Sequence, residues 1–466
     1  MSEKNLHQQM HQEMIDKKIF NQVKDYAFDY ADKALERTIF PTEQALTDLE
    51  LFHETLPEKS GNATHILELL HQYGSPATVS QIGGRYFGLV NGGVIPTALA
   101  AKWLSDFWDQ NTPLYVTSPV TSKLENVVEG WLNELFNLPK KTVAGFVSGS
   151  SMAILCGLAA ARFRIYQRLN WDFNSKGFID APRIRIVAGK HAHGAVVKAI
   201  ALLGFGKDTI EWVDVDSEGR IIADKIPVLD EHTILILQAG NVNSGSFDSF
   251  NEICDKATQA NAWVHIDGAF GLWAAGSENL KHLTSGIEKA DSWSVDGHKT
   301  LNTPYDSGII LCKDKEALVS ALQATGSYIV YSENRDGMLY TPEMSKRARA
   351  IELWATLKYL GKPGIDELVA GLHERAKQFA TGLSENGFIV LNDVVFNQVL
   401  VACDTDAETE ATLKKLQELN ECWCGGSQWF DKKVIRISVC SWATTKEDVT
   451  RSILSFVKAR NLVAKK

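Results

Sequence analysis

Short apolar runs alternate with helical stretches between about residue 80 and residue 315, and this alternation constrains the fold more than any other feature of the chain. Three such runs are 183–187, 233–237 and 262–266, each of a length typical of a buried strand. Strands that are connected through helices pair in parallel by right-handed crossovers, which leaves helices on both faces of the sheet. The sequence therefore predicts an α/β fold with a mostly parallel central sheet.

The patterns before and after this region are different. Residues 1 to about 75 have the spacing of polar, amphipathic helices, with breaks at Pro41 and Pro57. From about residue 316 a long helical stretch around 345–360 is followed by strand-like runs at 387–391, 397–401 and 434–439. We therefore expect an N-terminal helical arm over residues 1–75, a large domain over 76–315 and a smaller α+β C-terminal domain over 316–466.

Composition excludes several classes of protein. The chain has 466 residues, a formal net charge of −9 and no basic stripe, which argues against nucleic acid and anionic membranes as partners. No run approaches the ~20 apolar residues of a membrane span, and the first residues lack the basic-then-apolar order of a signal peptide. The seven scattered cysteines indicate free thiols and no metal site. We expect a soluble, cytoplasmic protein.

Two ionisable side chains follow strand-like runs. Asp267 comes directly after the run 262–266, and Lys299 comes shortly after the run 292–295. Ligands bind at the carboxyl ends of the strands in open parallel sheets. A lysine that can form a Schiff base and a carboxylate that keeps a pyridine nitrogen protonated are the two groups that a pyridoxal phosphate enzyme must provide. Either residue alone would be an ordinary turn or surface residue, so the hypothesis depends on the pair and its flanks.

An anion site is predicted at the start of a helix. The segment Phe146–Met152 leads into an apolar helical stretch, so Ser150 and Ser151 lie at its N-terminus. Free backbone N–H groups and the helix dipole attract anions there, and a serine hydroxyl can cap the helix and bind a phosphate oxygen. Most such caps bind nothing, so this prediction depends on its context.

The stretch Ala290–Lys299, with Leu301–Gly308 after it, resembles the lysine segment of the group II pyridoxal phosphate-dependent amino acid decarboxylases. This family includes the glutamate, aromatic amino acid and diaminobutyrate decarboxylases, and the resemblance extends from roughly Gly84 to Trp442. It implies pyridoxal phosphate enzyme fold type I and decarboxylation of an L-amino acid to its amine and carbon dioxide through a Lys299 Schiff base. It also implies a homodimer with a shared active site, in which the N-terminal arm wraps the partner subunit.

The resemblance assigns roles to individual residues. His193 lies five positions before Lys198, the interval that the family shows, whereas His191 does not. The implied catalytic residues are Lys299, Asp267 and His193. The implied cofactor-binding residues are Ser150, Ser151, His193, Asn241, Asp267, Ala269, His298 and Lys299. The implied substrate residues are Thr117, Ser118, Pro119, Tyr331, Tyr340 and Arg436, of which the arginine suits bidentate carboxylate recognition.

Each of these roles has a plainer alternative. His193 could cap a helix, Arg436 could form a structural ion pair, and the phenols could pack at the seam between domains. The segment 328–344 is shorter than the mobile loop whose tyrosine returns a proton in the aromatic decarboxylases, so Tyr331, Tyr340 and then His193 are the candidate donors. Asn241 stands where the family frequently has a hydroxyl. A transaminase or lyase, an oxidative aldehyde synthase and a non-catalytic binding protein are the alternative functions, and the sequence does not select the amino acid.

Overall fold

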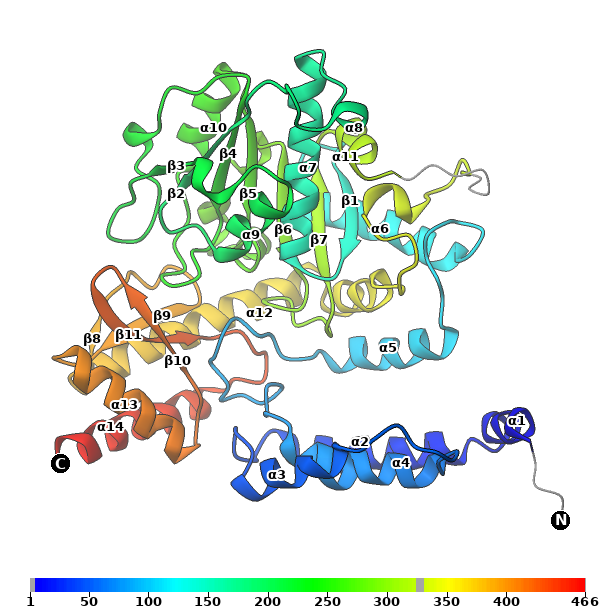
Figure 1. The fold of residues 1–466 in the computed structure, drawn as a ribbon. Coiled ribbons are helices and arrows are strands. Elements are labelled where there is room, and N and C mark those ends of the chain that lie inside the picture. The colour runs from blue at the N-terminus through cyan, green and yellow to red at the C-terminus, as the bar shows by residue number, and fades with distance from the viewer. Residues whose placement is uncertain (1–4, 324–330, 466) are drawn as a thin grey trace.

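A computed structural model describes residues 5–323 and 331–465, and a seven-stranded sheet forms its centre (Figure 1). Its strand order is β1-β7-β6-β5-β4-β2-β3. The five strands from β6 to β3 pair in parallel, whereas β7 runs antiparallel between β6 and β1. The strands are β1 (Val143–Val147), β2 (Arg185–Gly189), β3 (Ile210–Val213), β4 (Thr233–Gln238), β5 (Trp263–Asp267), β6 (Ser292–Asp296) and β7 (Gly308–Cys312). The prediction of a mostly parallel sheet is confirmed.

Side chains of the strands alternate between two buried cores, one on each face of the sheet. In β4, Ile234 and Ile236 enter one core and Leu235 and Leu237 enter the other. The first core also contains residues of α7 (Ser150–Arg168), α9 (Gly194–Leu202) and α11 (Lys315–Leu322). The second contains residues of α6 (Pro119–Leu135), α10 (Phe250–Gln259) and the first part of α12 (Ala350–Glu385). Because both faces are covered, the parallel strands appear in the sequence as continuous apolar runs.

A second, antiparallel sheet of order β10-β11-β9-β8 forms the C-terminal part. The second part of α12 shares its core with both α13 and α14. Gly361 has a φ of 57° and Pro363 follows, so α12 is kinked and one helix packs against both sheets. The elements are β8 (Ile389–Val390), β9 (Gln398–Ala402), β10 (Gly425–Trp429), β11 (Lys432–Ser438), α13 (Asp406–Leu419) and α14 (Lys446–Ala464). The expected smaller α+β unit is therefore present, while the exact domain boundaries stay predictions.

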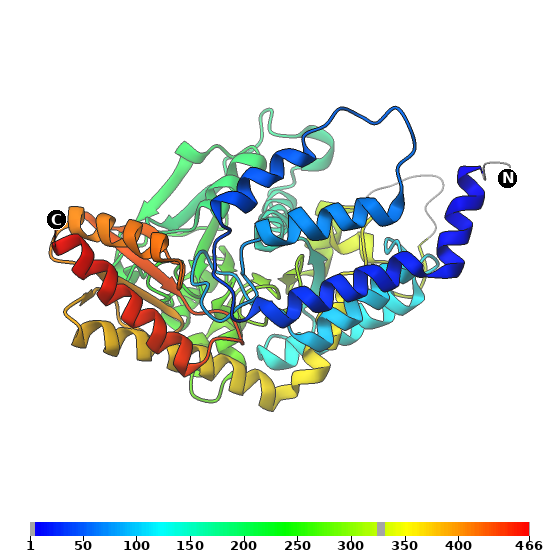
Figure 2. The same ribbon diagram turned by 90° about the horizontal axis from the view of Figure 1, so that it is seen from below.

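The N-terminal segment forms a helical arm that lies below the main body (Figures 1 and 2). Helix α2 lies against α5, where the rings of Phe20 and Phe107 are 4.9 Å apart and those of Phe28 and Trp103 are 6.1 Å apart. The helices are α1 (Leu6–Asp16), α2 (Lys18–Ala34), α3 (Glu43–Asp48), α4 (Ala63–Leu69) and α5 (Pro96–Trp108), and the short α8 (Phe173–Lys176) follows α7. None of the helices in the described part of the chain is long and apolar enough to cross a bilayer.

Candidate active site

The candidate site lies at the carboxyl ends of β5 and β6, which are neighbours in the sheet. Asp267 is the last residue of β5 and is in register with Ser294 of β6. The loops after the two strands are joined, because the Ala269 carbonyl accepts the amide of Asp296 at 2.8 Å. This join positions Asp267 relative to Lys299, which lies three residues beyond the end of β6.

Asp267 is a buried carboxylate, and only one of its two oxygens accepts hydrogen bonds from the described residues. Oδ1 accepts the Ala269 amide at 3.2 Å and the Ser294 hydroxyl at 3.3 Å, whereas Oδ2 accepts no hydrogen bond from the described residues. Burial raises the pKa of the Asp267 carboxyl, and the neighbouring His193 and Lys299 oppose that rise. A cationic donor at Oδ2 would offset the cost of burying this carboxylate.

Lys299 and His298 both face the carboxylate of Asp296. Lys299 Nζ lies 2.8 Å from Asp296 Oδ2, and His298 Nε2 lies 3.7 Å from Oδ1. His298 Nδ1 accepts the Ser307 amide at 3.1 Å, so the neutral ring carries its proton on Nε2. Burial lowers the pKa of His298, and the ring of Tyr305 stacks on it with centroids 4.3 Å apart. Asp296 is therefore the common neighbour of the predicted covalent and phosphate-binding residues.

The predicted phosphate site lies beside the same carboxylate. Ser150 is the first residue of α7, and its amide donates to Asp296 Oδ1 at 2.5 Å. Ser151 follows it and is exposed. The turn before α7 lies directly on β7, because a Cβ on Gly308 would come within 2.3 Å of Gly149 Cα. The structure thus brings the start of α7 to the loop that carries Lys299.

His193 and His191 lie in different surroundings although two positions separate them. His193 precedes α9, and its Nδ1 accepts the Ala195 amide at 3.2 Å, so the neutral ring carries its proton on Nε2. Burial lowers the pKa of His193, and the nearby Asp267 opposes that shift. His191 instead packs on the β10–β11 hairpin, with its ring centroid 5.0 Å from that of Trp429. Of the two, His193 is the one with an electrostatic connection to Asp267.

Arg436 is a half-buried guanidinium in β11. Its Nη1 donates to the Val242 carbonyl at 3.0 Å, and no carboxylate of the described residues lies within ion-pair distance of it. Burial lowers the pKa of Arg436, and its charge lowers that of His193. The structural ion pair that was the plainer alternative is therefore absent from the described residues, and the guanidinium is available to an anion.

Asn241 shapes the turn that follows β4. Its Oδ1 accepts the amides of Asn243 at 2.9 Å and Ser244 at 3.3 Å, and its Nδ2 donates to the His191 carbonyl at 3.4 Å. These bonds explain why an asparagine occupies this position. A contact with cofactor stays a prediction.

The structure does not join the predicted substrate loop to these groups within one chain. The Thr117 hydroxyl donates to the Leu114 carbonyl at 2.8 Å, and the Ser118 hydroxyl donates to Thr121 at 2.9 Å. Pro119 is the exposed first residue of α6. The hydrogen bonds of this segment stay local, so its contact with substrate remains a prediction.

Tyr340, a candidate proton donor, is a buried residue, and its role as a donor stays a prediction. It is 5% exposed, and the guanidinium of Arg335 lies 4.2 Å from its ring centroid. Arg335 is itself held by Glu125 at 2.8 Å, which anchors this segment to α6. Tyr331 is exposed, and residues 328–330 at the start of the predicted donor segment lie outside the described residues.

Sequence reasoning assigned no role to Asp296 or Tyr305, although both lie in the segments that carry the resemblance. The available signal for Asp296 was its position three residues before the lysine at the end of a strand. For Tyr305 no signal existed, because its stacking on His298 depends on how the loop turns back.

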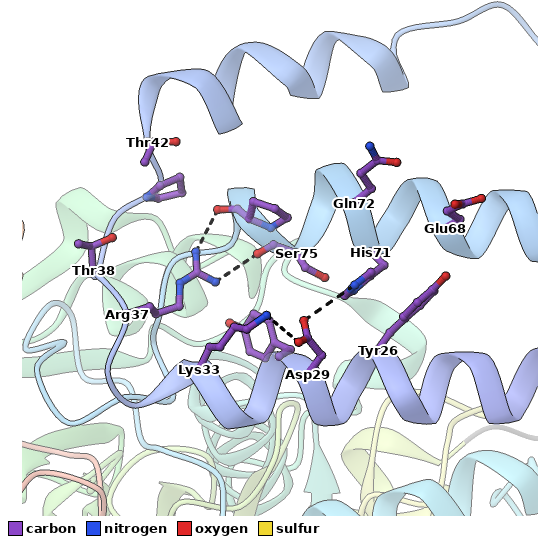
Figure 3. Close-up of a pocket in the computed structure, with 13 residues that line it drawn as sticks. Tyr26, Asp29, Lys33, Arg37, Thr38, Thr42, Glu68, His71, Gln72 and Ser75 are labelled. Carbon is purple, nitrogen blue, oxygen red and sulfur yellow. Dashed lines mark hydrogen bonds and ion pairs between the residues drawn. The ribbon is translucent and has the colours of Figure 1, made fainter.

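A separate pocket lies in the N-terminal arm, between α2 and the segment that follows α4 (Figure 3). Lys33 pairs with Asp29 at 2.6 Å, and Asp29 lies 3.9 Å from His71. Arg37 donates to the backbone carbonyl of Ser75 at 3.2 Å. None of the predicted site residues lines this pocket, so it is distinct from the candidate active site.

The groups at the strand ends fit pyridoxal 5′-phosphate. An aldehyde needs an amine, which Lys299 offers, and a pyridine nitrogen needs an acceptor, which Asp267 Oδ2 offers because no described residue donates to it. The phosphate needs N–H donors, and the helix start at Ser150 is such a donor site, although the Ser150 amide donates to Asp296 in this structure. The described residues contain no group of three or more His, Cys, Asp or Glu that could hold a metal ion, and all seven cysteines are free thiols.

Comparison with known proteins agrees with this chemistry. The model of the family described as "Pyridoxal-dependent decarboxylase conserved domain" matches residues 47–402. An aromatic-L-amino-acid decarboxylase of Bacillus atrophaeus is 26% identical over 431 residues, which cover 87% of each protein. An L-2,4-diaminobutyrate decarboxylase of Rhizobium meliloti is 28% identical over 285 residues, 58% of this chain and 55% of that protein. These relatives support decarboxylation of an amino acid in general and do not favour the transaminase, lyase and oxidative alternatives.

Solved structures show the same fold. The crystal structure of Oryza sativa TDC with PLP and tryptamine has a TM-score of 0.88 at 18% identity, covering 96% of this chain and 98% of that one. The crystal structure of mouse CSAD in apo form has a TM-score of 0.87 at 18% identity, covering 96% and 99%. The expected fold class of a pyridoxal phosphate enzyme is therefore confirmed.

Proposed function

The chain belongs to the pyridoxal-dependent decarboxylase family, and on that premise we propose that it converts an L-amino acid to its amine and carbon dioxide with Lys299 as the residue that binds the cofactor covalently. The observation that carries the proposal is the pair of Asp267 and Lys299 at the ends of adjacent parallel strands, with one oxygen of the buried Asp267 lacking a donor among the described residues. The enzyme class, a pyridoxal phosphate-dependent carboxy-lyase, follows from the family.

Each side chain of the site would have a role that follows from its chemistry. When bound, pyridoxal phosphate supplies a conjugated ring that takes up the electron pair left on Cα as carbon dioxide departs. Asp267 would hold a proton on the ring nitrogen through Oδ2, to which no residue of the described chain donates. Lys299 Nζ would bind the cofactor carbon and later release the product. Ser150, Ser151 and His298 would hold the phosphate, with the helix dipole of α7 favouring its charge.

Arg436 and His193 would act on the substrate. A half-buried guanidinium without a carboxylate partner among the described residues suits the substrate carboxylate. The neutral His193 ring has its proton on Nε2, because Nδ1 accepts the Ala195 amide. With Tyr340 packed against Arg335, we propose that His193 or the exposed Tyr331 returns a proton to Cα. His193 would do so as the imidazolium, which Asp267 favours and burial opposes.

Replacing Arg436 tests the substrate contact. Arg436→Met is expected to raise KM about 10- to 100-fold, since a charge-assisted hydrogen bond contributes about 1.5–3 kcal/mol. The measurement is steady-state kinetics together with inhibition by the product amine, which lacks the carboxylate and should bind both proteins equally. Lys433→Met, on the same strand and exposed, is the matched control. An unchanged KM, or equal losses of amine and substrate affinity, would remove Arg436 from carboxylate binding.

A homodimer is the assembly that we propose for this activity. Large apolar side chains of the arm are exposed, a liability in a monomer. They include Leu6, Met10, Met14, Ile15, Phe28, Leu49, Leu51, Leu56, Ile66 and Leu70. Helix α5 lies beside α2 (Figure 2) and adds exposed Leu104, Phe107 and Trp108. Sedimentation equilibrium should give twice the mass of one chain, and a single-chain mass at micromolar concentration would contradict this proposal.

A direct screen is needed to identify which amino acid is the substrate. The holoenzyme should be incubated with the twenty amino acids, ornithine and 2,4-diaminobutyrate, and the products identified by mass spectrometry. We expect one amino acid or a small group of related ones to give the corresponding amine. The absence of amine from every member of the panel, with cofactor bound, would contradict the proposed activity.

A further inference from the structure

We infer that Asp296 acts as an internal substitute for the cofactor phosphate, and that it competes with the phosphate for the amide at the start of α7. The inference rests on the proposed function, because it takes Ser150 and His298 as the phosphate site and Lys299 as the covalent residue. It concerns a residue to which neither the family resemblance nor the sequence analysis assigns a role.

The contacts of the carboxylate carry the inference. Asp296 is 1% exposed, so its charge is withdrawn from water. Oδ1 accepts the Ser150 amide at 2.5 Å and lies 3.7 Å from His298 Nε2, while Oδ2 lies 2.8 Å from Lys299 Nζ. The carboxylate thus contacts three groups that a bound cofactor would need: two at the phosphate and one at the reactive carbon.

The backbone leaves little space between the turn before α7 and β7. A Cβ on Gly149 would make ordinary van der Waals contacts with His298 Cε1 at 3.4 Å and Asp296 Oδ1 at 3.6 Å. A Cβ on Gly308 would clash with Gly149 itself at 2.3 Å. Glycine at position 308 lets the turn before α7 lie directly on β7. The Ser150 amide at this point already has an anionic acceptor in Asp296.

The negative charge of the phosphate determines how its binding affects the contacts of Asp296. A phosphate monoester carries about −1.5 to −2 at pH 7, and two anions within a few ångströms repel strongly in a site from which water is excluded. Binding of the phosphate therefore requires the Asp296 carboxylate to give up the Ser150 amide. The same carboxylate contacts both the helix start and the Lys299 ammonium, so it links these two parts of the site at a cost to phosphate affinity.

The test compares two ligands that differ only in the phosphate. Cofactor-free wild type and Asp296→Asn should be titrated with pyridoxal phosphate and with pyridoxal, following binding by absorbance. Asparagine keeps the shape and an oxygen acceptor but removes the charge. We expect the ratio of the pyridoxal Kd to the pyridoxal phosphate Kd to rise at least ~10-fold in the variant. Asp291→Asn is the matched control, since Asp291 pairs with Lys313 at 2.9 Å at the opposite end of β6, and its ratio should not change.

The ratio separates this role from a general effect on Lys299. Loss of a counter-ion for the lysine alone would change both affinities together and leave the ratio constant, which would overturn the inference. A fall in the ratio would also overturn it, because Asp296 would then assist phosphate binding. A second readout, the increase in Tm of the cofactor-free proteins with inorganic phosphate, should be larger for Asp296→Asn than for wild type. If Asp296→Asn does not fold, Asp296→Ser takes its place with the same expected direction.

These measurements distinguish a failure of the inference from a failure of the proposed function. Wild-type protein that binds pyridoxal phosphate and forms amine, with an unchanged ratio in the variant, leaves the proposed function intact and removes only the role of Asp296. Wild-type protein that binds neither ligand contradicts both.

Discussion

Lys299→Ala is expected to lower turnover by ~10³-fold or more, because the residue that binds the cofactor and releases the product is removed. The purified wild-type enzyme should be yellow and should lose that absorbance on treatment with borohydride, which fixes the cofactor to the amine that holds it. Mass spectrometry of a digest should then locate the added mass on the peptide that contains Lys299. The Lys299→Ala protein should show neither the visible absorbance nor the labelled peptide.

The matched control is Lys313→Ala. Lys313 also pairs with a carboxylate next to β6, Asp291 at 2.9 Å, and it is similarly sheltered, with 26% of its side chain exposed against 19% for Lys299. Its loss should leave absorbance and turnover near those of wild type. Borohydride labelling of any lysine other than Lys299 would overturn the assignment.

Asp267→Asn should lower turnover by about 10²- to 10⁴-fold while the cofactor still binds. The amide keeps the size of the carboxylate but cannot hold a proton on the ring nitrogen, so the ring accepts electrons less readily. The bonds of Oδ1 to the Ala269 amide and the Ser294 hydroxyl can persist with an amide oxygen, so the fold should be retained.

Two measurements are needed for this variant. Absorbance titration reports cofactor binding, and steady-state kinetics report turnover, so a loss of kcat with retained binding identifies an effect on chemistry. Asp291→Asn, which changes a partly buried carboxylate at the other end of β6, should be close to wild type in both. Near-normal kcat in Asp267→Asn would mean that another group is the partner of the ring nitrogen.

The central strands could be predicted from the sequence because burial on both faces leaves a strong signal. The predicted runs 233–237, 262–266 and 292–295 agree within one residue with β4, β5 and β6. The antiparallel direction of β7 could not be predicted, because an apolar run contains no information on its direction. The kink that lets α12 pack on both sheets depends on Gly361 in a left-handed conformation, which only the structure reveals.

In the site, too, the nearness of residues on neighbouring strands could be predicted, whereas contacts between residues far apart in the sequence could not. The nearness of Asp267 and Lys299 could be predicted because the carboxyl ends of neighbouring parallel strands meet at one edge. The contact between Asp296 and the Ser150 amide could not, because it joins residues 146 positions apart. The burial of Tyr340 likewise depends on its packing against Arg335, which no spacing in the sequence indicates.

The most direct test of the central claim is the balance of products from the best substrate of the amino acid screen. Carbon dioxide, amine, aldehyde, ammonia and peroxide should be quantified from the same reaction under air and under nitrogen. The account predicts one carbon dioxide for each amine, with the same rate in both atmospheres and without aldehyde or peroxide. Aldehyde with ammonia and peroxide that appears only under air, or a keto acid in place of carbon dioxide, would contradict it.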